Sequence, residues 1–342
     1  MHSIMYYHSI WIVASLLITI NNAAVAVRSL GSNPAVCGRS SLPALHTLRS
    51  DQITVLINGY AESRIPLLHS VAAAYAASSL VSSVLILWSN PSTSPLTLSQ
   101  LSHNLSLLYS ASGAAIEVIN QRSRSLNNRF LPRRGITTRG VLICDDDIEV
   151  DLASFEFAVR VWGSNEEKLI GLFVRSHDLD LGIKSWIYTV HHDKYSIVLT
   201  KFMVLKTEYL YEYSCGGGET MRRMRDVVDR LTNCEDILMN FVVADKGNVG
   251  PVMVVAENVR DWGDPRNEGE AAVAVQGEGL SGVRRGRGEH RKRRGECITE
   301  FHRILGRMPL RYSYGKVVDG VGEQGLCEKA GKLVLCDDQM LR

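Results

Sequence analysis

Three consecutive aspartates, Asp145, Asp146 and Asp147, are the residues of this chain best suited to chemistry. They directly follow the apolar run Arg139 to Cys144 (RGVLIC), which has the pattern of a buried strand. Crowded carboxylates repel one another unless a cation neutralises them, and Mg²⁺ or Mn²⁺ commonly bridges protein carboxylates to phosphate oxygens. The triplet therefore predicts a metal site that holds a nucleotide diphosphate. A solvated acidic turn is the alternative interpretation.

A second acidic pair, Glu235 and Asp236, opens the apolar helical pattern ILMNFVV. The preceding Asn233 can cap that helix, and the two acids favour its positive end, so a structural role would explain them. The functional alternative places Asp236 in a cleft, beside the sugar or the acceptor hydroxyl.

A basic run, Arg284 to Arg294 (RRGRGEHRKRR), is the third candidate. A solvated loop is the simplest interpretation. The run lacks the interleaved aromatic residues typical of nucleic-acid binding, so no nucleic-acid partner is expected. Arginines can instead cover a diphosphate through bidentate hydrogen bonds, although only one or two of these side chains could reach the ligand.

Composition and the N-terminal segment indicate where these residues work. The chain has 342 residues, is 45% hydrophobic and 22% charged, and carries a formal net charge of +2, so no global field points to nucleic acid. The apolar run Ile10 to Ile20 is too short for a comfortable membrane span, and Ala24 to Ala26 resembles a cleavage site. Residues 1–27 are thus predicted to be a signal peptide or a signal anchor, with residues 28–50 as a linker. The rest would lie in the secretory lumen.

The cysteines fit a lumenal chain. Seven are present, and none forms a close C-x-x-C pair, so a zinc site is not expected. Disulfides are permitted in the lumen, and the odd count leaves at least one thiol free or paired outside the chain. The usable N-glycosylation sequon begins at Asn104, because Asn33 and Asn90 are each followed by proline.

Strand and helix patterns alternate from Asp51 onward. The expected strands lie at residues 52–57, 81–88, 114–119 and 139–144, and the expected helices at residues 63–77 and 96–109. Such alternation predicts an α/β fold with a mostly parallel central sheet and helices on both faces. Ligands gather at the carboxyl ends of parallel strands, where Asn58, Asn90 and Asp145 stand.

The second half is less regular. Strands are expected at residues 168–175, 185–190, 195–200 and 252–255, and helices at residues 220–231, 235–243 and 297–305. Residues 261–288 are rich in Gly, Glu and Arg, so a mobile loop is predicted there, and residues 319–342 read as a tail. Residues 51–318 would then form one catalytic domain, with residues 51–150 as its nucleotide-sugar half and residues 151–318 as its acceptor half.

Four motifs make the prediction more specific, because they occur in a fixed order. They are Asn127 to Phe130 (NNRF), Val141 to Asp147 (VLICDDD), Asn233 to Phe241 (NCEDILMNF) and Met308 to Ser313 (MPLRYS). This set resembles the exostosin-type glycosyltransferase domain, glycosyltransferase family 64, over roughly Gln52 to Tyr314. The short chain, its N-terminal segment and the phrase INGYAESR are similar to the small plant members of that family.

The resemblance implies a GT-A fold, in which a Rossmann-like nucleotide-sugar half is joined to a smaller acceptor half. It also implies Mn²⁺ as the metal, with Mg²⁺ as the alternative, and retention of anomeric configuration. Retention through a carboxylate nucleophile on the opposite ring face and a same-face substitution both stay open.

The resemblance further implies a role for each matching residue. Asp147 would ligate the metal, Asp236 would be the essential carboxylate, and Arg294 would bind the diphosphate. Cys234 and Cys297 would form a disulfide. The residues implied to contact the nucleotide sugar are Asn58, Asn90, Asn128, Arg129, Asp145, Asp146, Glu235 and His290.

Three positions depart from the family pattern. The arginine expected just after the first strand falls on Glu62, the asparagine after the second strand falls on Ser89, and an asparagine upstream of NNRF falls on Arg124. Because these positions would touch the nucleotide and the sugar, they leave the donor undetermined.

The resulting hypothesis is transfer of mannose or an N-acetylhexosamine from GDP-mannose or a UDP-N-acetylhexosamine in the Golgi lumen. The expected acceptor is a glycan or a glycosphingolipid such as glycosylinositol phosphorylceramide, at the Golgi membrane. Hexosaminyl transfer to a proteoglycan-type glycan is the runner-up, and a non-catalytic lumenal sugar-binding protein is the alternative of another class. A homodimer stays open.

Overall fold

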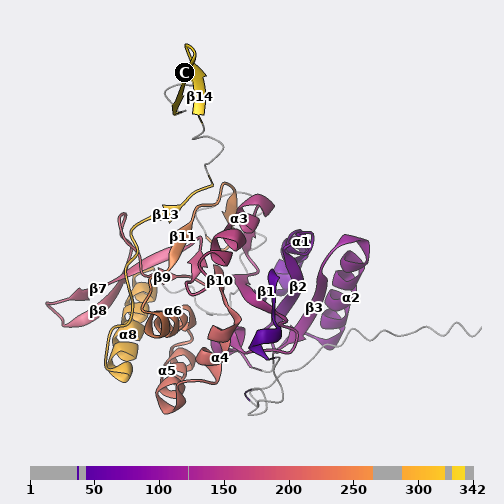
Figure 1. Cartoon of the computed structure of the whole chain (residues 1–342). Helices are drawn as coiled ribbons and strands as arrows, with labels where there is room; N and C mark the ends of the chain where they lie inside the picture. Colours follow the sequence, from indigo (N-terminus) through magenta and orange to yellow (C-terminus); the bar gives the residue numbers. More distant parts are fainter. Residues whose placement is uncertain (1–36, 38–43, 122, 265–286, 320–325, 336–342) are drawn as a thin grey trace, which may run out of the picture.

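The computed structural model describes residue 37 and residues 44–121, 123–264, 287–319 and 326–335. Its centre is an eight-stranded sheet in the order β13-β11-β6-β10-β4-β1-β2-β3 (Figure 1). The sheet strands are β1 Arg49–Gly59, β2 Val81–Trp88, β3 Ala115–Asn120, β4 Thr138–Asp145, β6 Ile170–Gly171, β10 Phe202–Lys206, β11 Val252–Val254 and β13 Lys316–Val317. Only β10 runs antiparallel to its neighbours, β4 and β6. The predicted mostly parallel α/β sheet of a GT-A fold is confirmed.

Helices cover both faces of this sheet (Figure 1). The helical segments are η2 Leu45–Thr47, η3 Glu62–Arg64, α1 Ile65–Ala76, α2 Pro95–Ser112, η4 Leu126–Phe130, α3 Leu152–Gly163, α4 Thr207–Ser214, α5 Gly218–Leu231, α6 Glu235–Gly247 and α8 Arg287–Leu305. Local chemistry sets several starts: the Ser94 hydroxyl caps α2 at Thr97 N, and Asp151 caps α3 at Ser154 N.

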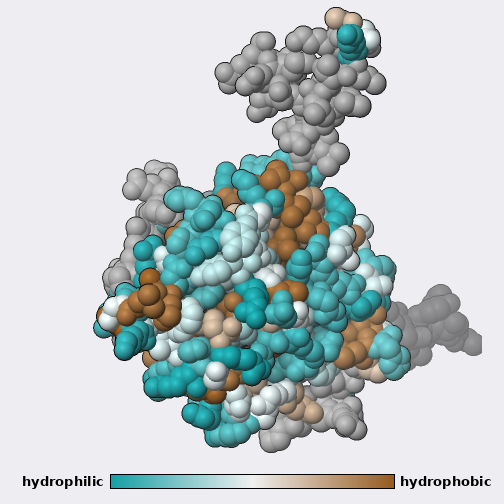
Figure 2. Space-filling view, turned by 60° about the vertical axis from the view of Figure 1, so that its left-hand side comes forward, coloured by the Kyte–Doolittle hydropathy of each residue, from teal (hydrophilic) through white to brown (hydrophobic). Residues whose placement is uncertain are grey.

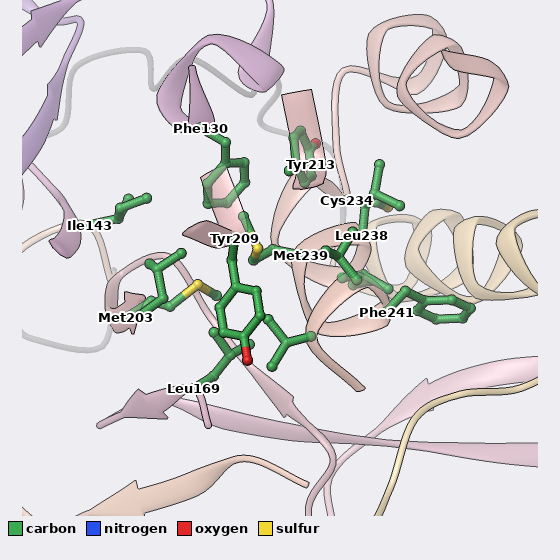
Figure 3. Close-up of a cluster of buried hydrophobic side chains, with 14 of the residues drawn as sticks. Phe130, Ile143, Leu169, Met203, Tyr209, Tyr213, Cys234, Leu238, Met239 and Phe241 are labelled. Carbon is green, nitrogen blue, oxygen red and sulfur yellow. The ribbon is translucent and has the colours of Figure 1, made fainter. Parts of the chain in front are cut away.

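Alternating side chains of the strands feed two separate cores. On β1, Val55 and Ile57 pack into a cluster with α1, α2 and α3, whereas Leu56 packs into a cluster with α4, α5, α6 and α8. Figure 3 shows the second cluster, in which Tyr209 lies beside Met203 of β10, whereas Phe241 of α6 faces α8 and contacts the ring of Phe301. Both faces of the sheet are therefore buried against helices.

The described residues also form three smaller sheets. They pair β5 Ile148–Val150 with β12 Val259–Asp261, β7 Val174–Asp180 with β8 Ser185–Thr189 and β9 Ile197–Val198, and β14 Leu326–Lys329 with β15 Lys332–Leu335. The β14–β15 hairpin lies inside the segment predicted as a tail. The strand predicted at residues 168–175 is divided between β6 and β7.

The predicted mobile loop at residues 261–288 has structured ends. Asp261 pairs with Ile148, and Arg287 begins α8, so that helix starts well before the predicted Cys297. Gly295 permits α8 to pack closely on β8, because a Cβ there would lie 2.9 Å from the Trp186 carbonyl. Residues 265–286 lie outside the described residues.

Two disulfides join distant segments. Cys234 bonds to Cys297, as the resemblance implied, and Cys37 bonds to Cys215, a pairing that the sequence did not indicate. Cys144 is a buried free thiol. Asn104 of the sequon is exposed on α2, so any glycan would attach to a helix rather than to a loop.

Within the described residues, no helix combines the length and the apolar character needed to cross a bilayer. The predicted signal peptide or anchor, residues 1–27, lies outside that part of the chain.

The buried side-chain amide of Asn240 connects helix α6 to strand β9. Its Oδ1 accepts a hydrogen bond from Val198 N (2.9 Å), and its Nδ2 donates to Val198 O (2.8 Å) and to Asp236 O (2.8 Å). Asn240 is 2% exposed, so water could not take over its hydrogen bonds to these backbone groups if the side chain were removed.

Replacing Asn240 by alanine should lower the free energy of unfolding by roughly 2–4 kcal/mol, because it leaves the backbone groups of Val198 unpaired. Chemical denaturation measures the loss. Gln100→Ala, on the exposed face of α2, is the matched control and should change stability by less than about 0.5 kcal/mol. Equal effects of both substitutions would contradict the assigned role of Asn240.

Candidate functional site

The acidic triplet lies at the carboxyl edge of the sheet. Asp145 is the last residue of β4 and stands level with Asn58 of β1, since the two parallel strands pair in that register. Asp146 and Asp147 form the turn into β5, and both are buried. This is where the strand pattern predicted that ligand-binding residues would gather.

Arg64, which was not among the predicted site residues, neutralises part of the triplet. Its Nη1 lies 3.0 Å from Asp146 Oδ1 and 3.0 Å from Asp147 Oδ2, and the side chain is 9% exposed. Glu62, the position at which the family pattern has an arginine, is exposed. The missed signal was the final letter of the phrase INGYAESR, because the one-turn helix η3 points Arg64 back toward the triplet.

Asp147 retains one unused ligand atom. Its Oδ1 is buried and has no hydrogen-bond partner. The neighbouring loop approaches closely: Trp262 N donates to Asp147 O (2.9 Å), and a Cβ on Gly263 would lie 2.2 Å from Asp147 Oδ2. Only glycine at position 263 therefore permits this close approach of the loop to the carboxylate.

A divalent cation fits this arrangement only with help from a ligand. Among the described residues, no group of three or more His, Cys, Asp or Glu side chains is placed to hold a metal ion. Mg²⁺-type sites commonly combine one or two protein carboxylates with substrate phosphates. Asp147, with its unpaired buried oxygen, suits that kind of shared site.

Arg129 of η4 links the triplet to helix α6. Its Nη1 lies 3.3 Å from Asp145 Oδ1 and 3.1 Å from Glu235 Oε1, and it donates to Thr200 Oγ1 (2.6 Å). The Thr200 hydroxyl in turn donates to Glu235 Oε1 (3.3 Å). One buried guanidinium thus joins a carboxylate at the end of β4 to a carboxylate at the start of α6.

A second buried ion pair stands at the start of α6. Arg294 Nη2 donates to Asp236 Oδ2 (2.5 Å), and Arg294 Nη1 donates to Asn233 Oδ1 (3.0 Å). The guanidinium also lies over the Tyr188 ring, 4.5 Å from its centroid. The Cys234–Cys297 disulfide holds α6 against α8 beside this pair.

Burial and crowding shift the protonation of these groups. Burial raises the pKa of Asp145 to about 7, with Arg129 opposing the shift and Asp147 adding to it. Burial, reinforced by Asp147, raises the pKa of Asp146 to about 6. Burial would lower the pKa of Arg294, but Asp236 outweighs it, so the net shift is upward and Arg294 stays charged. The triplet is thus short of positive charge near neutral pH.

Other predicted ligand residues lie at the edge of this cluster. Asn58 is buried and accepts a hydrogen bond from the hydroxyl of Ser89 (3.3 Å), one of the departing positions. His290 lies one helical turn before Arg294, and its pKa is lowered by burial and then by that neighbouring cation. The departing Arg124 lies over the Tyr60 ring, 5.8 Å from its centroid.

Two predicted residues are used locally. Asn90 Oδ1 accepts a hydrogen bond from Ser92 N (3.0 Å), which closes the turn after β2. Asn128 Nδ2 donates to the backbone and hydroxyl oxygens of Ser123 (3.1 and 2.9 Å), which shapes the segment before η4. Neither makes a contact with the charged cluster.

Comparison with known proteins gives a consistent family. The glycosyl transferase family 64 domain matches residues 53–322. The chain is 61% identical to Glycosyltransferase family protein 64 C3 of Arabidopsis thaliana over 313 residues, which cover 92% of this chain and 94% of that protein.

More distant relatives also match. Glycosylinositol phosphorylceramide mannosyl transferase 1 of Arabidopsis thaliana is 28% identical, with 78% of this chain and 76% of that protein covered. Exostosin-1a of Danio rerio is 31% identical over 59% of this chain, but the match spans only 26% of that protein. A solved mannosyltransferase of Pyrobaculum calidifontis, in complex with GDP-Man and Mn²⁺, has a TM-score of 0.34 and 14% identity, with 61% of this chain and 68% of that chain covered.

The raised pKa of Asp145 predicts a pH-dependent stability. The folded state binds a proton more tightly than the unfolded chain, so this group's contribution to stability is present at low pH and is lost as pH rises through about 7. In metal-free protein, the change in stability caused by Asp145→Asn should therefore be more favourable at pH 8 than at pH 5, by roughly 1–3 kcal/mol. Thermal unfolding in chelator at both pH values measures this difference. The control is Asp193→Asn at the exposed surface, and a pH-independent effect of Asp145→Asn would refute the assignment.

Proposed function

Because the chain belongs to glycosyl transferase family 64 and is a glycosyltransferase, we propose that it transfers mannose or an N-acetylhexosamine from a nucleotide-diphosphate donor. The acceptor is a glycan or a glycosphingolipid. A metal ion, Mn²⁺ or Mg²⁺, assists the departure of the diphosphate. The single observation that supports this most is that Arg129 pairs both with Asp145 of the triplet and with Glu235, the residue before the Asp236 that pairs with Arg294.

Asp147 is the proposed metal ligand. The support is its second carboxylate oxygen, Oδ1, which is buried and unpaired. When bound, the metal would neutralise the diphosphate and make it a better leaving group. Asp145 and Asp146 would contact the ribose and the sugar, and Asn58, at the end of β1, would lie near the base.

Cationic side chains would receive the phosphate oxygens. Arg294 is fixed by Asp236 and Asn233, so its orientation costs little entropy when the ligand binds. Arg64 lies beside Asp146 and Asp147, and His290, one helical turn before Arg294 on α8, would add a neutral hydrogen-bond donor. Such preorganised donors stabilise negative charge that develops on a leaving group.

Asp236 is the proposed carboxylate at the reacting carbon. It would orient the donor sugar and stabilise the positive charge that develops at the anomeric carbon. A nucleophile for double displacement must approach from the ring face opposite the leaving group. Asp236 forms an ion pair with Arg294, the proposed ligand of the diphosphate. Asp236 would therefore lie on the leaving-group side of the sugar. We therefore favour retention by same-face substitution.

The acceptor and the location follow from relatives. A relative that covers most of both chains is named for mannosyl transfer to glycosylinositol phosphorylceramide, which supports GDP-mannose as donor and a membrane sphingolipid as acceptor. The exostosins motivate the runner-up, a UDP-N-acetylhexosamine donor and a proteoglycan-type acceptor. Both relatives support work in the Golgi lumen at its membrane.

The proposal predicts metal-dependent release of nucleotide from one donor. Purified protein is incubated with Mn²⁺ and each of a panel of GDP- and UDP-sugars, with and without a sphingolipid acceptor, and released nucleotide is measured. Asp147→Ala should reduce turnover by at least about 100-fold, because the metal loses its protein ligand. Asp193→Asn should have no effect.

Each alternative has its own result in this assay. Turnover that survives Asp147→Ala would overturn the metal assignment. Absence of turnover with every donor, despite nucleotide binding, would favour a non-catalytic sugar-binding protein.

Arg64 should oppose the metal but assist the nucleotide. Because its guanidinium occupies Asp146 and Asp147, Arg64→Gln should strengthen binding of Mn²⁺ alone by roughly threefold or more. The same change should weaken binding of a nucleoside diphosphate by roughly tenfold, since one charge-assisted hydrogen bond is lost. Titration calorimetry measures both affinities. Arg49→Gln, an exposed arginine paired with Asp51, is the control, and shifts of the same sign for both ligands would disprove this division.

A further inference from the structure

A β-hairpin beside the site exposes aliphatic side chains at its tip. In the β7–β8 hairpin, Leu181 is 77% exposed and Ile183 is 69% exposed, and Leu179, Ile187 and Val190 are 45%, 37% and 50% exposed. The hairpin projects from the body next to α8 (Figure 1), and the tip forms a hydrophobic patch among hydrophilic residues at the left edge of Figure 2. Contiguous apolar patches on a soluble surface mark interaction sites.

The tip is built as a rigid turn. Asp180 Oδ1 accepts hydrogen bonds from Gly182 N (2.9 Å) and Ile183 N (3.3 Å), and Lys184 adopts a left-handed conformation with φ 51°. These contacts fix the backbone around Leu181 and Ile183 while their side chains stay in solvent. Little conformational entropy would therefore be lost when the tip is buried.

The base of the same hairpin belongs to the proposed site. Tyr188 of β8 lies under the guanidinium of Arg294, which pairs with Asp236. Gly295 and Thr299 of α8 pack against β8, with Thr299 Oγ1 accepting a hydrogen bond from Trp186 N (2.9 Å). Strand β8 begins at Ser185, three strand steps or about 10 Å before Tyr188, and Ile183 lies two turn residues further out. The tip thus stands a fixed short distance from the reacting groups.

The charges around the hairpin select an occupant. Helix α8 carries Lys or Arg at six positions and Glu at three. The exposed cations beside the tip are Lys184 of the turn and Arg303, which lies near the end of α8 whose Thr299 contacts Ser185. An apolar tip flanked by cations complements a surface with an apolar interior and anionic headgroups. A projecting tip of bulky aliphatics also suits a deformable medium, whereas a protein partner would need a matching hollow.

We propose that the β7–β8 hairpin inserts Leu181 and Ile183 into a lipid bilayer containing anionic lipids and so holds the proposed site against the membrane surface. Delivery of a lipid acceptor by this contact rests on the proposed function. The contact itself does not, because it needs only the tip and its flanking cations.

Photocrosslinking locates this contact in the full chain, whatever the N-terminal segment does. The probe is a vesicle of phosphatidylcholine and phosphatidylserine with a small fraction of lipid that carries a diazirine in its acyl chain. Mass spectrometry should find crosslinks in the peptide spanning residues 179–187, and their yield should fall when phosphatidylserine is omitted or salt is raised. Crosslinks confined to other segments would overturn the proposal.

Paired variants test the side chains. Leu181→Ser combined with Ile183→Ser should lower crosslinking in that peptide by roughly tenfold or more, because two aliphatic side chains no longer enter the bilayer. The matched control is Leu96→Ser combined with Leu107→Ser, two exposed leucines of α2, which should leave hairpin crosslinking unchanged. Equal effects of the two pairs would refute insertion of the tip.

Two further measurements separate the alternatives. If the tip variant dissociates a dimer in analytical ultracentrifugation and the wild type gives no lipid crosslink, the surface binds a second copy and the proposal is wrong. Nucleotide release in detergent should be unchanged in the tip variant. Hairpin crosslinking without turnover from any donor would refute the proposed function while supporting the membrane contact.

Discussion

The buried guanidinium of Arg129 is the interaction on which the site depends. It lies between Asp145, at the end of β4, and Glu235, at the start of α6, so one cation joins carboxylates that the chain separates by 90 positions. Removing a partner from such a pair leaves an uncompensated buried charge, which is strongly unfavourable. Arg129 therefore fixes the end of β4 relative to the start of α6.

Charge balance continues outward from this centre. Arg64 forms ion pairs with Asp146 and Asp147, and Arg294 forms one with Asp236, so each carboxylate has a cation within salt-bridge distance. The balance is incomplete, because burial still raises the pKa of Asp145 to about 7 and leaves Asp147 Oδ1 without a partner. A site in this condition favours the arrival of a cation together with an anionic ligand, as a metal and a nucleotide diphosphate would provide.

The same helix that supplies Arg294 supports the projecting hairpin. Gly295 lets α8 approach β8, and the Cys234–Cys297 disulfide fixes α8 against the helix that carries Asp236. Catalytic groups and the exposed aliphatic tip therefore share one rigid framework. Because this framework is rigid, the site would lie at a fixed distance from any surface that the tip contacts.

The sequence by itself determined the parallel core, because buried strands such as Val81–Trp88 and the β4 run into Asp145 carry their pattern in neighbouring residues. Ordered motifs also identified the family and grouped Arg129, the triplet, Asp236 and Arg294. Only the tertiary structure assigned Arg64 to the triplet, restricted Asn90 and Asn128 to local turns, and extended α8 back to Arg287. Those outcomes depend on where a side chain points and on contacts between distant segments, and local periodicity contains neither.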